Sequence, residues 1–146
     1  MRKKYISVIF ITWLIILFRI TVFRSNFNLN HLFLNGKLNL IPFIELQRIL
    51  VKGDLWQFIY LFIGNIIWFI PFGFMMRILT KLNKLKIAIC ALILSFLIEL
   101  MQFIFGTGIS ELDDLILNTL GALIGMMIYH WIALLIAQRK QNHLSQ

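Results

Sequence analysis

Acidic and amide side chains that could take part in chemistry lie in one apolar stretch, 94–125, which reads LSFLIELMQFIFGTGISELDDLILNTLGALIG. Glu99 and Gln102 are three positions apart within it, and this spacing puts both side chains on one face of a helix. A carboxyl group in such a place can act as a general acid or base, or help to hold a hard cation. The stretch is therefore the candidate functional centre.

A second polar face follows the short loop in this stretch. Its members step by three, four, three and four positions, which is helical spacing: Glu111, Asp114, Asn118, Gly121 and Gly125. Asp113 adds a third acid beside them. If the two apolar segments pair as an antiparallel hairpin, Glu99 and Asn118 lie at a similar depth, about 9 Å from the loop at 1.5 Å per residue.

A carboxylate at that depth is costly unless it meets a partner, a proton or a water-filled pocket. Asn118 alone is explained well by hydrogen bonding between helices, a normal role for intramembrane amides. Glu99 is explained less well in this way, because such bonding does not require a charge. We therefore expect a polar pocket. Its candidate residues are Glu99, Gln102, Glu111, Asp113, Asp114 and Asn118 of the hairpin, with Asn65 and Arg19 from the first two spans.

The composition indicates an integral membrane protein. Of 146 residues, 60% are hydrophobic and 14% charged, and the mean hydropathy is +0.88. The chain is expected to form one membrane domain over residues 1–146. Its net charge of +8 is concentrated at the ends of apolar segments, which fits membrane topology better than nucleic-acid binding. Four apolar segments are long enough to span the bilayer: 5–23, 56–79, 87–105 and 115–137.

The first apolar segment follows Arg2, Lys3 and Lys4 and has no small-residue cleavage site, so we expect an uncleaved helix with a cytoplasmic N-terminus. Arg19 lies about one turn inside its outer end. Two interpretations stay open for this side chain. It extends along the helix to the membrane surface, or it pairs with the carboxylates of the hairpin.

The segment between the first two spans predicts a short amphipathic helix. Pro42 is acceptable in a first helical turn, and Phe43, Leu46 and Leu50 follow at helical spacing. Such a helix would lie in the headgroup plane, or it is only a connector. The predicted fold class is thus an all-α membrane protein, with four transmembrane helices and a short interfacial helix between the first and second.

The later spans carry one of the pocket candidates, Asn65, and the residues expected to govern helix packing. Asn65 lies near the middle of the second span, and Pro71 interrupts its backbone hydrogen bonding next to Gly73. Gly121 and Gly125 permit close contact between helices. Because these two glycines share the face of Asp114 and Asn118, that face is expected to pack against protein.

Charge placement predicts the topology. Nine Lys or Arg residues and no acids occupy the N-terminus, the second loop and the C-terminus. Most acids lie in the first and third loops. Both termini are therefore expected in the cytoplasm of a bacterial plasma membrane, with the acidic hairpin tip facing outward.

Cysteine and histidine usage predicts neither a metal centre nor another cofactor. Cys90 is the only cysteine, and His31, His130 and His143 are widely separated. No nucleophile with an adjacent base is visible, so a catalytic residue is not assigned.

Four segments together resemble the VanZ-like family, which includes the teicoplanin-resistance protein of Gram-positive bacteria. They are NLIPF (39–43), NIIWFIPFG (65–73), IELMQ (98–102) and ELDDLILNTLGALIG (111–125). The resemblance covers about residues 5–130. It implies a small multi-span membrane protein and, for some members, reduced sensitivity to lipidated glycopeptide antibiotics.

Three kinds of function remain to be weighed. The favoured one is a non-catalytic protein whose outward pocket engages an amphipathic ligand at the outer leaflet, with membrane lipids, a lipoglycopeptide antibiotic or a cell-wall precursor as partners. The second is an intramembrane enzyme that modifies a cell-wall lipid or peptide with a Glu/Asp pair. A transporter or structural partner is the third, for which a homo-oligomer would be needed.

Overall fold

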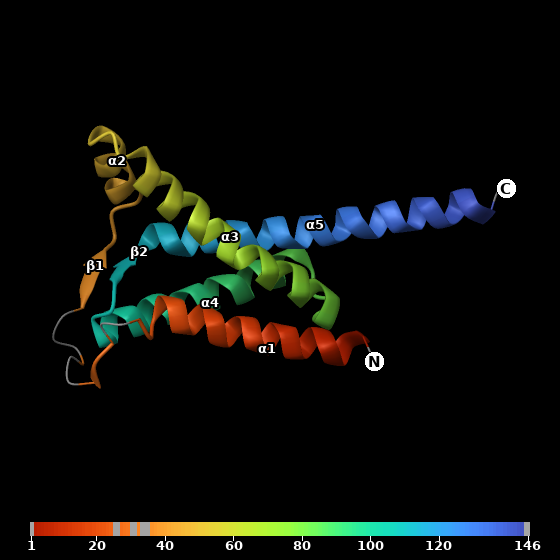
Figure 1. The fold of residues 1–146 in the computed structure, drawn as a ribbon, viewed down its shortest axis with the longest axis horizontal. Helices are drawn as coiled ribbons and strands as arrows, with labels where there is room; N and C mark the ends of the chain where they lie inside the picture. Colours follow the sequence, from red (N-terminus) through yellow and green to blue (C-terminus); the bar gives the residue numbers. More distant parts are fainter. Residues whose placement is uncertain (1, 25–26, 30–31, 33–35, 145–146) are drawn as a thin grey trace.

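The computed structural model describes residues 2–24, 27–29, 32 and 36–144 (Figure 1). Four long helices lie side by side, and the short elements gather at the end of the bundle away from both termini. The elements in chain order are α1 (Arg2–Thr21), β1 (Lys37–Asn39), α2 (Ile44–Val51), α3 (Leu55–Thr80), α4 (Lys84–Phe105), β2 (Ile109–Glu111) and α5 (Leu112–Leu144).

The four long helices α1, α3, α4 and α5 are each long and apolar enough to cross a membrane. Their bounds match the predicted spans to within a few residues, except that α5 continues seven residues further, to Leu144. This confirms the prediction of four spanning helices. The protein is a multi-pass membrane protein.

Local sequence signals set the helix ends. Asp54 caps α3 by accepting a hydrogen bond from the backbone N–H of Gln57, at 2.9 Å. Asn83 caps α4 in the same way through the N–H of Lys86, at 3.0 Å. Gly106 ends α4 in the left-handed conformation, with φ of 61°, which glycine adopts without strain.

Helices α3 and α5 run in the same direction and pack through glycines. A Cβ atom on Gly121 would lie 2.2 Å from the Ile66 carbonyl oxygen, and one on Gly125 would lie 1.9 Å from that of Ile70. Gly73 makes the reciprocal contact with Ala122. The backbones approach this closely only because no side chain stands between them.

Helix α1 packs on the bundle through aromatic rings. Trp13 stacks on Phe10 and meets Phe69 edge-on, and both Trp13 and Phe10 contact Phe72. Pro71 lies next to these residues, in the wall of a shallow apolar groove between α1 and α3. Pro71 therefore lies on the side of α3 that faces α1.

The connecting segments hold a small sheet, which the prediction of an all-α fold did not include. Strands β1 and β2 pair in parallel, with Lys37 opposite Ile109 and Asn39 opposite Glu111. The two strands are three residues each and belong to loops that are far apart in the sequence. Such short strands give no detectable alternation, and nothing local indicates their pairing.

Helix α2 lies between the first and second spanning helices, as expected. Its buried residues are Leu46 and Ile49, whereas Leu50 is 49% exposed. The buried face is therefore rotated from the predicted one, because α2 packs on protein elements as well as facing outward. Its placement in the headgroup plane stays a prediction.

Candidate functional site

A small cavity of about 40 Å³ lies among α1, α3, α4 and α5. We call it the polar cavity. Its apolar wall comes from Leu17, Trp68, Phe69 and Ile98. Its polar lining comes from seven side chains on four segments, which are Thr21, Arg24, Asn65, Glu99, Gln102, Asp114 and Asn118. A space of this size with several polar partners is large enough for a water molecule or a small ion.

Two carboxyl groups face each other in this cavity. The side chains of Glu99, on α4, and Asp114, on α5, are hydrogen-bonded to one another. An ionised carboxylate only accepts hydrogen bonds, so this contact requires a proton on one of the two. Glu99 also accepts a hydrogen bond at Oε2 from the backbone N–H of Glu111, at 2.9 Å, and is only 5% exposed.

Amide side chains complete the contacts across the helices. Asn65 on α3 donates to Asp114 Oδ1, at 2.5 Å, and Asn118 on α5 donates to the Ser95 hydroxyl on α4, at 2.8 Å. The register is therefore Glu99 opposite Asp114 and Ser95 opposite Asn118. Amide and carboxyl groups from three helices thus meet in two layers, one helical turn apart.

Among the residues that line the cavity, Gln102 has a buried side-chain atom with no partner in the described part of the chain. Its Nε2 donates to the carbonyl oxygen of Thr21, at 3.1 Å, and so ties α4 to the end of α1. Its Oε1 is buried and has no hydrogen-bond partner among the described residues. A buried acceptor without a donor is costly, so this atom is available to a bound donor.

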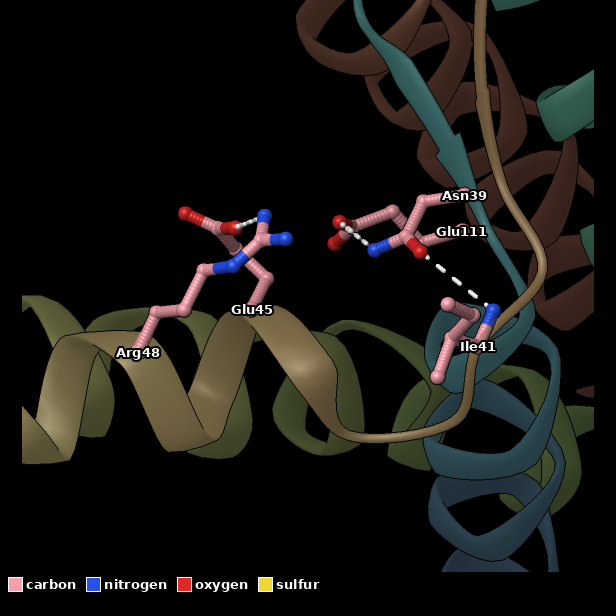
Figure 2. Close-up of polar contacts among 5 residues, drawn as sticks. All are labelled: Asn39, Ile41, Glu45, Arg48 and Glu111. Carbon is pink, nitrogen blue, oxygen red and sulfur yellow. Dashed lines mark hydrogen bonds and ion pairs between the residues drawn. The ribbon is translucent and has the colours of Figure 1, made fainter.

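Glu111 and Asp113, which were predicted as pocket residues, lie outside the cavity and anchor the loops. Glu111 accepts a hydrogen bond at Oε1 from the side chain of Asn39, at 3.1 Å, and Asn39 also accepts from the N–H of Ile41, at 3.3 Å (Figure 2). Burial raises the pKa of Glu111, and the hydrogen bond from Asn39 partly offsets the effect.

Asp113 fixes the turn before α2. It is 3% exposed, and its Oδ1 accepts a hydrogen bond from the backbone N–H of Phe43, at 2.6 Å. Phe43 has a positive φ of 59°, an uncommon conformation for a residue with a bulky side chain. The Ser110 hydroxyl adds a further tie by donating to the Glu99 carbonyl oxygen, at 2.6 Å.

The arginine at the cavity is not the predicted one. Arg19 is exposed and donates to the backbone carbonyl of Phe23, and within the described chain it makes no ion pair with the hairpin carboxylates. Arg24, one turn beyond, lines the cavity instead. Sequence reasoning missed it because a basic residue just after a span is normally an interfacial anchor. Arg24 lies after the end of α1 at Thr21, so helical spacing could not have placed it at the cavity.

Glu99 also borders a second space. An apolar groove of about 200 Å³ is lined by Leu38, Phe96, Leu100 and Phe103, with Glu99 and Ser110 as its polar members. The Glu99 residue therefore separates a groove on the outside of α4 from the polar cavity. In the described part of the chain, no three His, Cys, Asp or Glu side chains come together as a metal site would require.

Comparison with known proteins identifies the family. The VanZ/LLP1 family model matches residues 10–135. This chain belongs to the VanZ/LLP1 family. It is similar to Protein VanZ of Enterococcus faecium, with 31% identity over 120 residues, which cover 80% of this chain and 68% of that protein. No solved structure matches the chain.

The VanZ/LLP1 match contains every residue of the polar cavity. It begins within α1, before Leu17, and ends within α5, after Asn118. Of the described residues, 2–9 at the start of α1 and 136–144 at the end of α5 lie outside the match. The cavity thus lies in the part of the molecule that defines the family.

Proposed function

We propose that this protein contributes to resistance against teicoplanin-type glycopeptide antibiotics in a Gram-positive bacterium. In this proposal it does so without catalysis, by engaging an amphipathic ligand at the outer leaflet through the polar cavity. Membership of the VanZ/LLP1 family supports the link to resistance. The ligand is a lipid, a lipoglycopeptide or a cell-wall precursor.

The observation that carries the proposal is the convergence of polar groups from separate helices on one small space. Single polar side chains that hydrogen-bond across helices are a normal feature of membrane proteins. Here two carboxyl groups, three amides and a guanidinium line the same cavity, and one amide oxygen is left for a ligand. Buried polar groups at this cost are typical of functional sites in membranes.

The placement of charges supports an outward-facing cavity. The cavity lies near the bundle end that carries β1, β2 and α2, whereas the Lys-rich turn between α3 and α4 lies at the other end, with both termini. With that basic end in the cytoplasm, the cavity opens near the outer leaflet.

The test is the antibiotic susceptibility of a strain that lacks the gene, and of the same strain with the gene restored on a plasmid. We expect the restored strain to tolerate more of a glycopeptide that carries a lipid tail, and to gain little against one without the tail. Equal susceptibility of the two strains to both antibiotics would contradict the proposal.

A second candidate function is favoured by the facing carboxyl groups of Glu99 and Asp114. A pair that shares a proton could act as general acid and general base on a cell-wall lipid or peptide precursor. Purified protein in lipid would then convert a labelled lipid-linked precursor, and Glu99→Gln would abolish the conversion. Absence of product, with and without divalent cations, would rule out this candidate.

A further inference from the structure

We propose that the polar cavity binds a primary ammonium group, with Arg24 placed at the cavity for an anionic group next to it. The inference deepens the proposed function, on which it rests, because it names the chemistry of the ligand. Its basis is the set of acceptors in the cavity, the size of the cavity and the position of Arg24.

The acceptors match the donors of a primary ammonium. Such a group has three N–H donors and no acceptor. The cavity offers the carboxyl groups of Glu99 and Asp114 together with the unpartnered Oε1 of Gln102. Gln102 is 5% exposed, so its free oxygen points to a donor inside the protein and not to bulk water.

Charge favours a cation at this position. Glu99 and Asp114 face each other and need a proton between them when the cavity holds no cation. A bound ammonium group replaces that proton, which leaves to solvent, and it satisfies both carboxylates with charge-assisted hydrogen bonds. Asn65 and Asn118 hold the surrounding geometry through their bonds to Asp114 and Ser95.

The size of the cavity favours a primary over a quaternary ammonium. Its volume of about 40 Å³ is close to the space of about 30 Å³ that one water occupies in the liquid. A primary ammonium is similar in size to water. A trimethylammonium is wider by three methyl groups and has no N–H to offer to Gln102.

Arg24 indicates what lies next to the ammonium. It is exposed, and its Nε donates to the Ile20 carbonyl oxygen, at 3.1 Å. This contact directs the planar guanidinium, which suits phosphate and carboxylate oxygens. A ligand with an ammonium group and an anion a few bonds apart would fit this arrangement. The headgroup of an aminophospholipid and a soluble phosphoamine both have these two groups.

The test measures lipid binding to the purified, full-length protein by native mass spectrometry. The probes are phosphatidylethanolamine, its monomethyl and dimethyl derivatives, and phosphatidylcholine, all with the same acyl chains. We expect affinity to fall along this series, by at least about tenfold from first to last, because N–H donors are lost and bulk is added. Equal binding of the first and last lipids would overturn the proposal.

Matched variants show that the preference arises in the cavity. Glu99→Gln removes a charge from the cavity, and Glu45→Gln makes the same change on α2, where Glu45 pairs with Arg48. We expect Glu99→Gln to remove the preference and Glu45→Gln to keep it. A preference that survives in both Glu99→Gln and Asp114→Asn would also overturn the proposal. The lipid series on the unaltered protein needs no variant to fold.

Soluble phosphoethanolamine and methylamine separate the sources of the group. Displacement of bound phosphatidylethanolamine by millimolar phosphoethanolamine, but not by phosphocholine, supports a site for the primary ammonium itself. No displacement, together with a clear lipid preference, assigns the site to membrane lipids. Displacement by sodium ions as effective as that by methylamine shows a general cation site and overturns the proposal. None of these outcomes depends on whether the protein confers resistance.

Discussion

At the scale of single residues, Glu99 is held from several directions at once. Its side chain contacts Asp114 across the cavity and the N–H of Glu111 in β2, and its backbone carbonyl accepts from Ser110. One residue thus joins α4, α5 and the loop sheet. A change at Glu99 should therefore affect both the cavity and the loop conformation, and Glu99→Gln is the least disruptive choice because it keeps the hydrogen-bond acceptor.

The first prediction concerns Asp113. Asp113→Ala removes the acceptor for the Phe43 N–H and leaves that group, which is partly buried, without its partner. We expect a loss of about 1–3 kcal/mol in the free energy of unfolding. Thermal unfolding in detergent measures this loss. Glu45→Ala on α2 is the control: Glu45 is partly exposed and forms a surface ion pair with Arg48, so the loss should be at most about 1 kcal/mol. Equal effects of the two changes would contradict the role given to Asp113.

The second prediction uses the raised pKa of Glu111. Because the folded protein holds this proton more tightly than the unfolded chain does, Glu111 favours folding below its ordinary pKa of 4.5 and loses that contribution as pH rises through the raised value. Glu111→Gln cannot ionise and keeps the acceptor for Asn39.

Unfolding curves of both proteins across the pH range test this sign. Above the raised pKa, the Glu111→Gln variant should be more stable than the unaltered protein, and the difference should vanish in acid. The predicted sign would be wrong if the free energy of unfolding of the variant, minus that of the unaltered protein, were lower at neutral pH than in acid.

Part of the cavity was predictable residue by residue. Helical spacing placed Glu99 with Gln102, and Asp114 with Asn118, because the period of a helix decides which side chains share a face. The structure adds the register, with Asp114 and not Asn118 opposite Glu99. It also places Arg24 at the cavity in place of Arg19. Neither fact follows from periodicity. The first depends on the offset of α4 and α5 along their axes, and the second depends on where α1 ends.

At the scale of elements, the tightest association is between α3 and α5, where backbone meets backbone at Gly121 and Gly125. This contact positions Asn65 on α3 against Asp114 on α5. Close packing of the two helices is thus a condition for the geometry of the cavity, although the glycines themselves lie elsewhere along the contact.

The third prediction separates packing from backbone effects. Gly125→Ala places a Cβ atom against the Ile70 carbonyl and should cost about 1–3 kcal/mol through forced separation of α3 and α5. Gly64→Ala is the matched control in α3, because a Cβ there meets open space. The control should be neutral or slightly stabilising. Unfolding in detergent measures the stability of both variants. Equal losses of stability in Gly125→Ala and Gly64→Ala would contradict the close contact between α3 and α5.

The elements were predictable to different degrees. The four spanning helices follow from length and hydropathy, because only a long apolar helix satisfies its backbone inside lipid. The pairing of β1 with β2 could not be predicted, since it joins residues about 70 positions apart in three-residue strands. The buried face of α2 includes Ile49 because of tertiary contacts, so it could not be predicted from the sequence of α2 either.

At the scale of the whole molecule, the account depends on which end of the bundle faces outward. The fourth prediction tests it with single cysteines in a Cys90→Ser background. Lys52→Cys, at the end of α2, should react with a membrane-impermeant thiol reagent added to intact cells. Lys84→Cys, at the start of α4, should react only after permeabilisation. The opposite pattern would place the cavity near the inner leaflet and contradict the proposal that the ligand binds at the outer leaflet.

The most direct measurement is the susceptibility of cells that express Glu99→Gln or Asp114→Asn at the protein level of the unaltered chain, against a lipid-tailed glycopeptide. Glu45→Gln makes the same kind of change away from the cavity and is the control. We predict that both cavity variants lose the protection that the unaltered protein gives, and that the control keeps it. Full protection by both cavity variants would show that the facing carboxyl groups are not the functional centre.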